Sequence, residues 1–404
     1  MKMNLKGYKE FAILKESVDT LKLSLPKAIY ILNKAFKKDG EQLYVVGGAV
    51  RDAILGIKPK DFDLATSARP DKIQSILNKN DIKNFPKGEA FGVISAIINN
   101  EEFEIATFRE DIGKGRRPDA VNFTTIDKDV LRRDLTINAL FYDIDKEIVV
   151  DLVGGVKDLL DKIIKTVGNP LDRFGEDPLR KLRALRFASR LGAKLDPEVH
   201  AALSKDEFKD YKKGESLGDV SKERIRDEFL KSIEKAKSPS SYLQWLSNYN
   251  YWVFIFPSPD GYSNTDDSYI NKIWTDSNNP ILQVATLLRN VNLKDNSKYA
   301  KQLRTQYAYS VDDIRQIETL HSFLKFDVMN LINIKKDIEI SKLKEKDALE
   351  FAKNNAIDRN LIYALYDFKL SVKGNDPEVS GLSGKSLGDK IKELEAEAFK
   401  KIYK

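Results

Sequence analysis

The chain contains no cysteine and only two histidines, His200 and His321, among its 404 residues. Without cysteine the protein has no disulfide bond, no thiolate-bound zinc and no cysteine nucleophile. Two histidines cannot build a histidine-rich metal site, and we expect both to be ordinary surface or packing residues. The chemistry of this protein must therefore rest on other residue types.

Long apolar segments are also missing. Residues 1–10 (MKMNLKGYKE) lack the apolar region of a signal peptide. The most apolar run, residues 251–256 (YWVFIF), is far shorter than the roughly 20 residues that cross a bilayer. Together with the absence of cysteine, this predicts a protein of the reducing cytoplasm.

Charge of one sign is not strongly in excess. Charged residues make up 32% of the chain and the formal net charge is +6, which permits a polyanionic partner without requiring one. A hydrophobic fraction of 42% is sufficient for buried cores. Because 404 residues exceed what one core organises, we expect two to four domains.

Strand and helix signals divide the chain into two parts. The first part alternates β-branched segments with helical ones, and after residue 155 nearly every segment carries apolar residues at helical spacing. We therefore predict an α+β fold, with an N-terminal α/β head containing a mixed sheet and all-helical domains after it. The predicted strands are 43–46, 61–64, 92–99, 102–108 and 147–152, and the predicted helices of the head are 49–55, 70–79 and 131–141.

Residues 43–64 (LYVVGGAVRDAILGIKPKDFDL) form the most informative stretch. Its two glycines let the backbone approach phosphate oxygens, and its arginine can donate a charge-assisted fork to a phosphate. Its two aspartates, two residues apart on a predicted strand, are expected to point to one face and to suit Mg²⁺. The candidate residues are Gly47, Gly48, Arg51, Asp61 and Asp63, and together they predict the handling of a nucleoside triphosphate.

A second charged motif occupies residues 131–140 (LRRDLTINAL), at the start of a predicted helix. Asp134 and Thr136 can serve as local caps there. Asn138 follows Asp134 by one helical turn, so the two side chains can face the same site.

A third motif begins at residues 176–180 (EDPLR), where Pro178 suits the first turn of a helix. Arg180, Arg183 and Arg186 recur every three residues along this helix. Taken alone, the pattern is adequately interpreted as an amphipathic helix with solvated arginines.

The three motifs, in this order and spacing, resemble those of the nucleotidyltransferase superfamily. The resemblance is to the class II tRNA CCA-adding enzymes of bacteria and eukaryotes and to the related poly(A) polymerases. It is dense over residues 43–230 and thin beyond them. Within it, residues 113–118 (GKGRRP) resemble the flexible loop that the family uses when it switches from C to A, and residues 151–159 resemble the junction between head and neck.

The resemblance implies roles for the charged residues of all three motifs. Two Mg²⁺ ions would be held by Asp61 and Asp63, with Glu104 either a third ligand or an ordinary strand charge. The triphosphate would be cradled by Gly47, Gly48 and Arg51, and Arg133 and Asp134 would contact phosphate and sugar beside Asn138. The incoming base would be read by Asp177 and Arg180, while Arg183 and Arg186 would hold base or phosphates.

The base-reading assignment has a direct physical argument. Cytosine and adenine both present an exocyclic amine beside a ring acceptor, so Asp177 can accept from the amine while Arg180 donates to the ring. Uracil and guanine place a carbonyl where the amine should be. That carbonyl would face the Asp177 carboxylate and leave acceptors unpaired, at a cost of roughly 1–3 kcal/mol. The pair therefore predicts selection of C and A without a template.

The implied function is addition of C, C and A to the 3′ end of tRNA from CTP and ATP, with the acceptor arm recognised by shape and backbone. A poly(A) polymerase, an A-adding enzyme and a non-catalytic RNA-binding protein on the same fold remain alternatives. The predicted segments are a helical arm (1–40), a catalytic head (41–152), a helical neck that recognises the base (153–235), a helical body (236–330) and a helical tail that binds tRNA (331–404).

Overall fold

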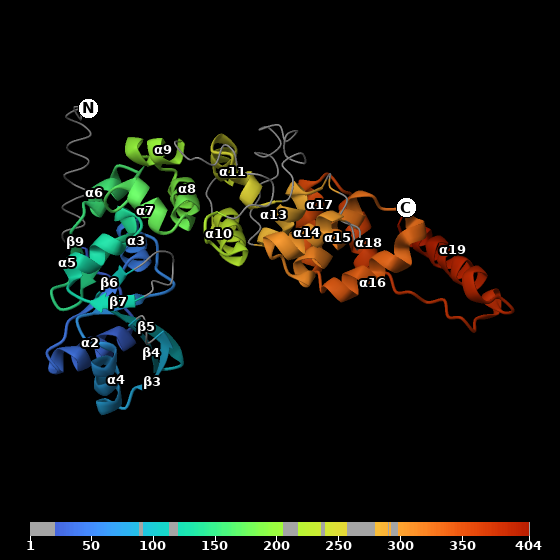
Figure 1. Ribbon diagram of the computed structural model, residues 1–404. Helices are drawn as coiled ribbons and strands as arrows, with labels where there is room; N and C mark the ends of the chain where they lie inside the picture. Colours follow the sequence, from blue (N-terminus) through green and yellow to red (C-terminus); the bar gives the residue numbers. More distant parts are fainter. Residues whose placement is uncertain are drawn as a thin grey trace. The chain divides into compact units, whose positions relative to one another are not determined.

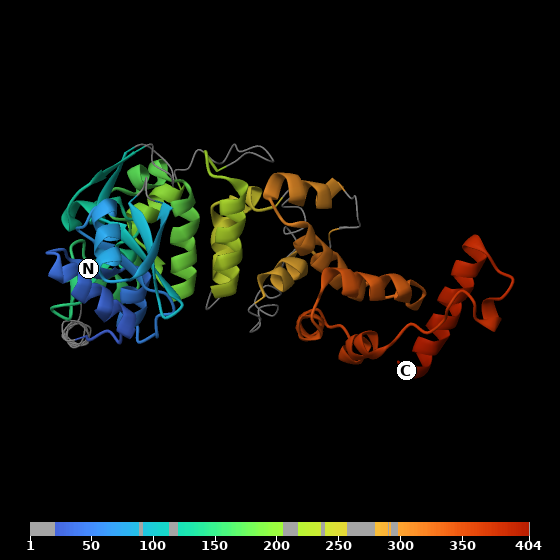
Figure 2. The ribbon, with the colours of Figure 1, turned by 90° about the horizontal axis from the view of Figure 1, so that it is seen from below.

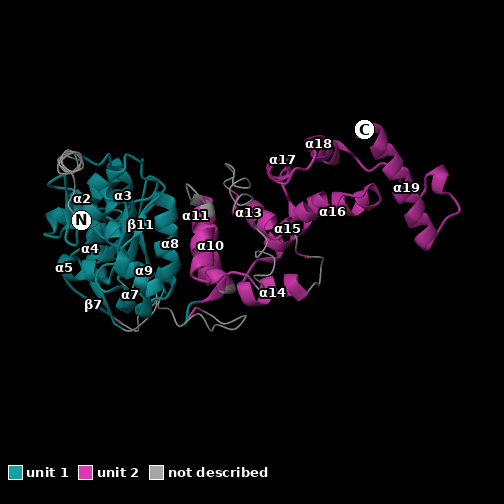
Figure 3. Ribbon diagram, turned by 90° about the horizontal axis from the view of Figure 1, so that it is seen from above, with its two compact units in different colours: residues 1–206, 218–220 teal, residues 207–217, 221–404 magenta. Residues whose placement is uncertain are grey.

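A computed structural model describes residues 21–88, 92–112, 120–204, 217–235, 239–256, 279–289, 291 and 298–403. The chain divides into two compact units (Figure 3), unit 1 with residues 1–206 and 218–220, and unit 2 with residues 207–217 and 221–404. Of the predicted N-terminal arm, the described part contains helix α2 (Lys27–Lys38). The flexible-loop segment 113–118 lies outside the described residues. The five predicted segment boundaries stay predictions.

Unit 1 is built on a seven-stranded sheet with the order β3-β4-β5-β2-β1-β8-β9 (Figure 1). Strands β2 and β5 pair in parallel and every other neighbouring pair is antiparallel, so the sheet is mixed as predicted. The strands are β1 (Leu43–Val46), β2 (Asp63–Thr66), β3 (Lys83–Gly88), β4 (Val93–Ile98), β5 (Glu101–Thr107), β8 (Leu140–Asp143) and β9 (Ile148–Asp151). A separate hairpin consists of β6 (Arg109–Ile112) and β7 (Ala120–Phe123).

Both faces of the central strand β1 are covered, because all four of its residues are buried. On one face, α2 and α4 (Pro70–Lys79) pack side by side against the sheet (Figures 1 and 2). On the other face, Tyr44, Phe108 and Phe141 form a ring cluster with centroid separations of 5.9–6.3 Å. Residues 126–139 and Val167 close over this cluster, and they carry the second charged motif.

The predicted helix over residues 131–141 is wrong. The segment contains two 3₁₀ turns, η2 (Val130–Arg132) and η3 (Thr136–Asn138), separated by extended backbone at Arg133 and Leu135. Its backbone bonds go to a distant segment instead of along a helix: the Thr136 amide donates to the Lys165 carbonyl and the Val167 amide to the Asp134 carbonyl. Tertiary pairing thus replaced the helical hydrogen bonds that the local spacing favoured.

The remaining differences in the sheet have physical explanations. Strand β3 was not predicted because its sequence, KNFPKG, is polar and contains Pro86, which an edge strand tolerates. Strand β2 begins at Asp63, two residues later than predicted, so Asp61 precedes the strand. Strand β8 begins at Leu140, within the segment assigned to the wrong helix, and extends past its end to Asp143.

After β9, the described residues up to 204 form four helices and a two-stranded parallel sheet. Helices α7 and α8 are consecutive in sequence and together carry the third motif. The elements are α6 (Gly155–Leu160), β10 (Ile163–Ile164), α7 (Pro170–Glu176), α8 (Leu179–Leu191), β11 (Lys194–Leu195) and α9 (Pro197–Ser204).

Every regular element described in unit 2 is helical, which confirms the predicted fold class. Aromatic residues build its core near Phe229, which lies 5.4 Å from Phe256 by ring centroids, and a second core around Phe399. The α-helices are α10 (Lys222–Lys235), α11 (Pro239–Asn248), α13 (Pro280–Leu287), α14 (Lys298–Tyr307), α15 (Val311–Leu324), α16 (Leu331–Ser341), α17 (Glu345–Asn354), α18 (Arg359–Asp367) and α19 (Gly384–Ile402). None of the helices in the described ranges has the length and apolar character needed to cross a membrane.

Candidate functional site

The two glycines of the first motif form the corner between β1 and α3 (Gly48–Ile54). Gly47 has φ +69° and ψ −119°, a conformation that glycine adopts readily and that other residues avoid. Its amide donates to the Leu140 carbonyl at 2.8 Å, and a Cβ atom at Gly47 would stand 3.5 Å from the Asn138 carbonyl oxygen. The corner is therefore held tightly against the end of the second motif.

Strand register places a carboxylate beside this corner. Asp63 is the antiparallel partner of Val46, the residue directly before Gly47. On its other side, β2 pairs in parallel with β5 so that Leu64 faces Ile105, which puts Asp63 and Glu104 on the same face of the sheet. The structure thus lines up Glu104, Asp63 and the glycine corner along one edge.

The carboxylates repel one another there. Desolvation by neighbouring protein atoms raises the pKa of Asp63 although the residue is exposed at the start of β2, the charges of Glu104 and Asp61 raise that pKa further, and Arg133 opposes them. Glu104 is paired with Lys87 at 2.7 Å, and the same lysine lies 2.8 Å from Glu102. Excess negative charge with oxygen donors only is the chemistry that suits a hard divalent cation. Within the described ranges, however, no three carboxylate or histidine side chains gather closely enough to hold a metal.

The prediction that Asp61 and Asp63 share one strand is wrong for Asp61, which precedes β2. Strand alternation therefore does not orient the Asp61 side chain, although its charge acts on Asp63. The fit to Mg²⁺ rests on donor chemistry, and the metal-binding role of Asp61, Asp63 and Glu104 stays a prediction.

Arg51 is nearly buried, with 3% of its surface exposed. Its Nε and Nη2 donate to Asp52 Oδ1 at 2.9 and 2.7 Å, and Nη1 donates to the Asn138 side-chain oxygen. Its guanidinium lies 4.8 Å from the ring centre of Phe187. Two nitrogens of Arg51 thus bond its neighbour Asp52 within α3, and the third joins α3 to η3, a structural task that the predicted phosphate contact does not include.

Phe187 was not among the candidate residues of the sequence analysis. Its ring also carries Arg186, whose guanidinium lies 4.4 Å from the ring centre. At the far end of α8, Arg190 donates to the second oxygen of Asp52 at 3.2 Å. Three of the predicted arginines therefore lie near this one aromatic ring, because the Arg183 guanidinium is also 6.0 Å from its centre.

Asp134 joins the second motif to the third. Its Oδ2 accepts from Arg183 Nε at 2.7 Å and Nη2 at 2.6 Å, and its Oδ1 accepts from the Leu135 amide at 2.8 Å and from Asn138 Nδ2 at 3.4 Å. Burial acts to raise the pKa of Asp134, but Arg183 and the amide outweigh it and bring the pKa to about 2. Asp134 and Asn138 are together as predicted, across a 3₁₀ turn and not a helical one.

Asp129 is a functional candidate that the sequence analysis missed. It is 1% exposed and its carboxylate pairs with both Arg132, at 2.8 Å, and Arg133, at 2.9 Å. The guanidinium of Arg133 lies 4.6 Å from the ring centre of Phe141. The available signal was an aspartate three and four residues before consecutive arginines, which is ion-pair spacing along a helical turn.

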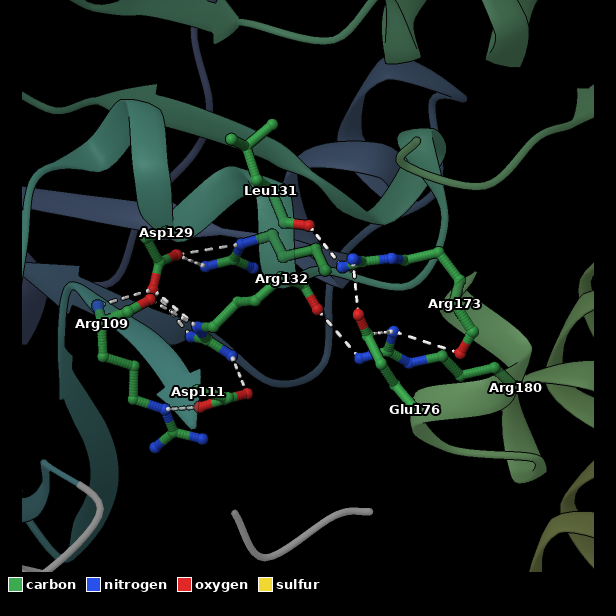
Figure 4. Close-up of polar contacts among 9 residues, drawn as sticks. Arg109, Asp111, Asp129, Leu131, Arg132, Arg173, Glu176 and Arg180 are labelled. Carbon is green, nitrogen blue, oxygen red and sulfur yellow. Dashed lines mark hydrogen bonds and ion pairs between the residues drawn. The ribbon is translucent and has the colours of Figure 1, made fainter. Parts of the chain in front are cut away.

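The base-reading candidate Arg180 adjoins the same segment (Figure 4). Arg180 donates from Nη2 to the Arg132 carbonyl at 2.9 Å and from Nη1 to Glu176 at 2.7 Å, and Arg173 donates to the Leu131 carbonyl at 2.7 Å. Asp177 is 8% exposed, and its Oδ1 accepts from the Leu179 amide at 3.2 Å, at the start of α8. The α7–α8 pair is thereby bonded to residues 131–132, next to Arg133.

The junction motif has a structural explanation. Asp151 accepts hydrogen bonds from four successive amides, those of residues 153–156, at 2.9–3.2 Å. These bonds satisfy the first amides of α6. Helix α6 then packs so closely on η3 that a Cβ at Gly155 would lie 2.1 Å from the Thr136 carbonyl oxygen. The junction therefore sets the position of η3, and with it the second motif, relative to the sheet.

Comparisons with known proteins find sequence relatives and a similar fold. Residues 43–165 match the family model described as the poly A polymerase head domain. A CCA-adding enzyme of Bacillus velezensis is 41% identical over 215 residues, which are 52% of this chain and 51% of that protein. Poly(A) polymerase I of Salmonella typhi is 34% identical over 262 residues, which are 61% of this chain and 53% of that protein.

Among solved structures, a Bacillus stearothermophilus CCA-adding enzyme in complex with CTP has a TM-score of 0.69 at 21% identity, over 92% of this chain and 91% of that one. The chain spans about half the length of the relatives that it matches in sequence. The likeness of fold extends further, into the helical part. The predicted family resemblance and the predicted α+β architecture are confirmed.

Proposed function

Because residues 43–165 match the poly A polymerase head-domain family, we propose that this protein is a tRNA nucleotidyltransferase that adds CCA without a template. The substrates are CTP, ATP and the 3′ end of tRNA. The observation that carries the proposal is the register that sets Asp63 beside the Gly47 corner, with Arg133 close enough to act on the charge of Asp63.

The reaction forms a bond between the 3′-oxygen of the RNA and the α-phosphorus of the nucleotide, and breaks the bond to pyrophosphate. The hydroxyl proton is lost to solvent and pyrophosphate leaves. Bound at Asp61 and Asp63, Mg²⁺ would supply the lowered pKa of the attacking hydroxyl and charge stabilisation of the leaving oxygens. The protein's own contribution is mostly positioning, as in other phosphoryl-type transfers.

The positioning groups surround the glycine corner. Gly47 and Gly48 let the triphosphate approach the backbone, because neither has a side chain to prevent it. Arg133, which lies beside Phe141, supplies positive charge to the phosphates. Asp134 and Asn138 contact the nucleotide's sugar, next to those phosphates. Asn138 is kept in place by Arg51 and by Asp134.

Base selection falls to Asp177 and Arg180. An Arg180 guanidinium has five N–H groups, and its hydrogen bonds to Glu176, Arg173 and Arg132 use three of them. Its remaining N–H groups can donate to a ring acceptor while Asp177 accepts from an exocyclic amine. The acceptor arm of tRNA is the proposed partner.

A primer-extension experiment tests the proposal. The protein is incubated with Mg²⁺, CTP and ATP and with tRNA that ends before, after one or after two cytidines of its CCA, and the products are sequenced. We expect each tRNA to be completed to CCA and then left unextended. Asp61→Ala should abolish every addition at unchanged melting temperature, whereas Asp71→Ala, an exposed aspartate in the first turn of α4, should behave as wild type.

Poly(A) polymerase is the second candidate, since poly(A) polymerase I of Salmonella typhi is 34% identical to this chain over 262 residues. That enzyme class would extend every primer with repeated A from ATP alone. A single A added only after two cytidines would instead identify an A-adding enzyme. Retained tRNA binding with no addition to any primer would leave the non-catalytic RNA-binding alternative.

A further inference from the structure

Asp129 collects an unusual number of hydrogen bonds for one carboxylate. Its Oδ1 accepts from the Arg109 amide at 3.1 Å and from Arg132 Nε and Nη2 at 2.9 and 2.8 Å. Its Oδ2 accepts from Arg133 Nε and Nη2 at 3.2 and 2.9 Å. Each guanidinium group therefore approaches this buried carboxylate through its Nε–Nη2 edge, a geometry that permits little rotation of either group; Figure 4 shows Arg132 beside Asp129.

The orientation of Arg133 follows from these bonds. With Nε and Nη2 held by Asp129, the third nitrogen, Nη1, is directed away from that carboxylate. Nη1 lies 3.9 Å from the position that a Cβ of Gly47 would take, and it donates no hydrogen bond to any residue in the described ranges. The side chain of Arg133 keeps 15% exposure. The unused donor of Arg133 therefore stands at the glycine corner.

The charges in this cluster leave a surplus of one positive charge. Three arginines face two carboxylates. Asp129 pairs with Arg132 and Arg133. The second carboxylate, Asp111, accepts from Arg109 Nε at 2.8 Å. Without Asp129 the surplus would rise to two on largely buried groups, and desolvation of unpaired charge is costly. Asp129 makes it possible to keep a charged, fixed guanidinium beside the site.

We infer that Asp129 is a positioning residue for nucleotide binding: it holds the Arg133 fork so that Nη1 meets the triphosphate at the Gly47 corner. The inference rests on the proposed function and deepens it. Asp129 itself touches no substrate, because both of its oxygens are occupied by Arg109, Arg132 and Arg133. Its effect concerns the phosphates and is therefore the same for CTP and ATP.

The test measures CTP and ATP affinity by calorimetry, with melting temperature alongside, for wild type, Asp129→Asn and Arg133→Lys. In Asp129→Asn, an NH₂ donor replaces one carboxylate oxygen and cannot accept from a guanidinium. In Arg133→Lys, the positive charge stays but the paired N–H groups that bond Asp129 are lost. We expect each variant to lose about 10- to 100-fold in affinity for both nucleotides, the value of a charged hydrogen bond. The double variant should be little weaker than Arg133→Lys alone, because both changes remove the same interaction.

The matched control is Asp143→Asn, another buried aspartate of the same unit. Asp143 is 8% exposed and accepts from the amides of Asp145 and Lys146 at 3.1 and 3.0 Å, away from the motif arginines. It should lose stability without losing nucleotide affinity. That contrast separates positioning from a general loss of folded structure.

Several results would overturn the inference. Wild-type nucleotide affinity in folded Asp129→Asn would do so. So would a double variant whose fold-loss in affinity equals the product of the two single-variant losses. If Asp129→Asn does not fold, Arg133→Lys decides, since wild-type affinity there means that the fork orientation is irrelevant. If the wild-type protein binds neither nucleotide, the proposed function itself fails and the inference with it.

Discussion

Replacing Gly155 by alanine should damage both stability and turnover, and the structure sets the scale. The added Cβ would stand 2.1 Å from the Thr136 carbonyl oxygen, whereas real Cβ contacts are not found below 3.0 Å. The backbone of α6 or η3 must therefore shift by about 0.9 Å, a shift that overpacking data value at about 1–3 kcal/mol. For a unit of this size we expect the melting temperature to fall by about 2–12 °C.

The effect on turnover arises because η3 carries Asn138. Asn138 accepts from Arg51, and its carbonyl oxygen lies 3.5 Å from the Gly47 Cβ position, so displacement of η3 moves the glycine corner. A misplacement of about 1 Å can cost on the order of 100-fold in rate. The assay is CMP incorporation into tRNA under saturating CTP, with thermal unfolding of the same preparations.

Two other glycines of unit 1 supply controls. A Cβ at Gly154 meets no atom within 4 Å but the residue has φ +80°, so Gly154→Ala should cost about 1 kcal/mol of stability and leave turnover unchanged. Gly175 also has open space, lies within α7 and has an ordinary φ, so Gly175→Ala should be neutral or slightly stabilising. Wild-type turnover in Gly155→Ala would refute the argument that α6 sets the position of η3.

Three further predictions concern the charged residues. The pKa of Asp134 is about 2 when folded, below its ordinary value of 3.8, so its ion pair with Arg183 stabilises the protein above pH 4 and is lost as pH falls toward 2. Asp134→Asn should therefore lower the free energy of unfolding by about 2 kcal/mol at pH 7 and flatten its dependence on pH between 4 and 2, measured by urea titration; an unchanged pH profile would contradict this. Asp151→Ala should lower the free energy of unfolding by about 1–2 kcal/mol, because the first amides of α6 lose their acceptor. A wild-type urea midpoint would show that solvent replaces the bonds to Asp151 equally well. Arg180→Ala should loosen the choice among the four nucleotides more than it weakens phosphate binding, measured by calorimetry with each nucleotide, and an equal loss for all four would count against base reading.

The sequence contained enough information to identify the three motifs but not their local geometry. Gly47, Asp63 and Arg133 could be selected because phosphate and cation binding need a free backbone, a carboxylate and a fixed guanidinium. The shape of residues 131–141 could not be selected in the same way. Its apolar spacing fits a helix, and only the pairing of Leu135 with Thr166, distant in sequence, makes it extended.

The structural contacts that the candidate residues also make could not be predicted from the sequence either. Nothing in the spacing of Arg51 and Asn138 shows that they bond to each other across 87 positions of sequence. Asp129 was passed over because an aspartate before two arginines is usually a solvated helix charge. It becomes notable only when burial to 1% exposure forces both arginines onto it.

The chain by itself therefore determined the residue types at the site, the mixed α/β head and the helical character of the C-terminal part, because periodicity and side-chain chemistry are local properties. The tertiary structure decided which of these groups meet: Asp63 with the Gly47 corner through strand register, Asp134 with Arg183 across two motifs, and α6 with η3 at a glycine. Such meetings depend on how a sheet, its connections and its covering helices close around a common core, and no short window of sequence contains that closure.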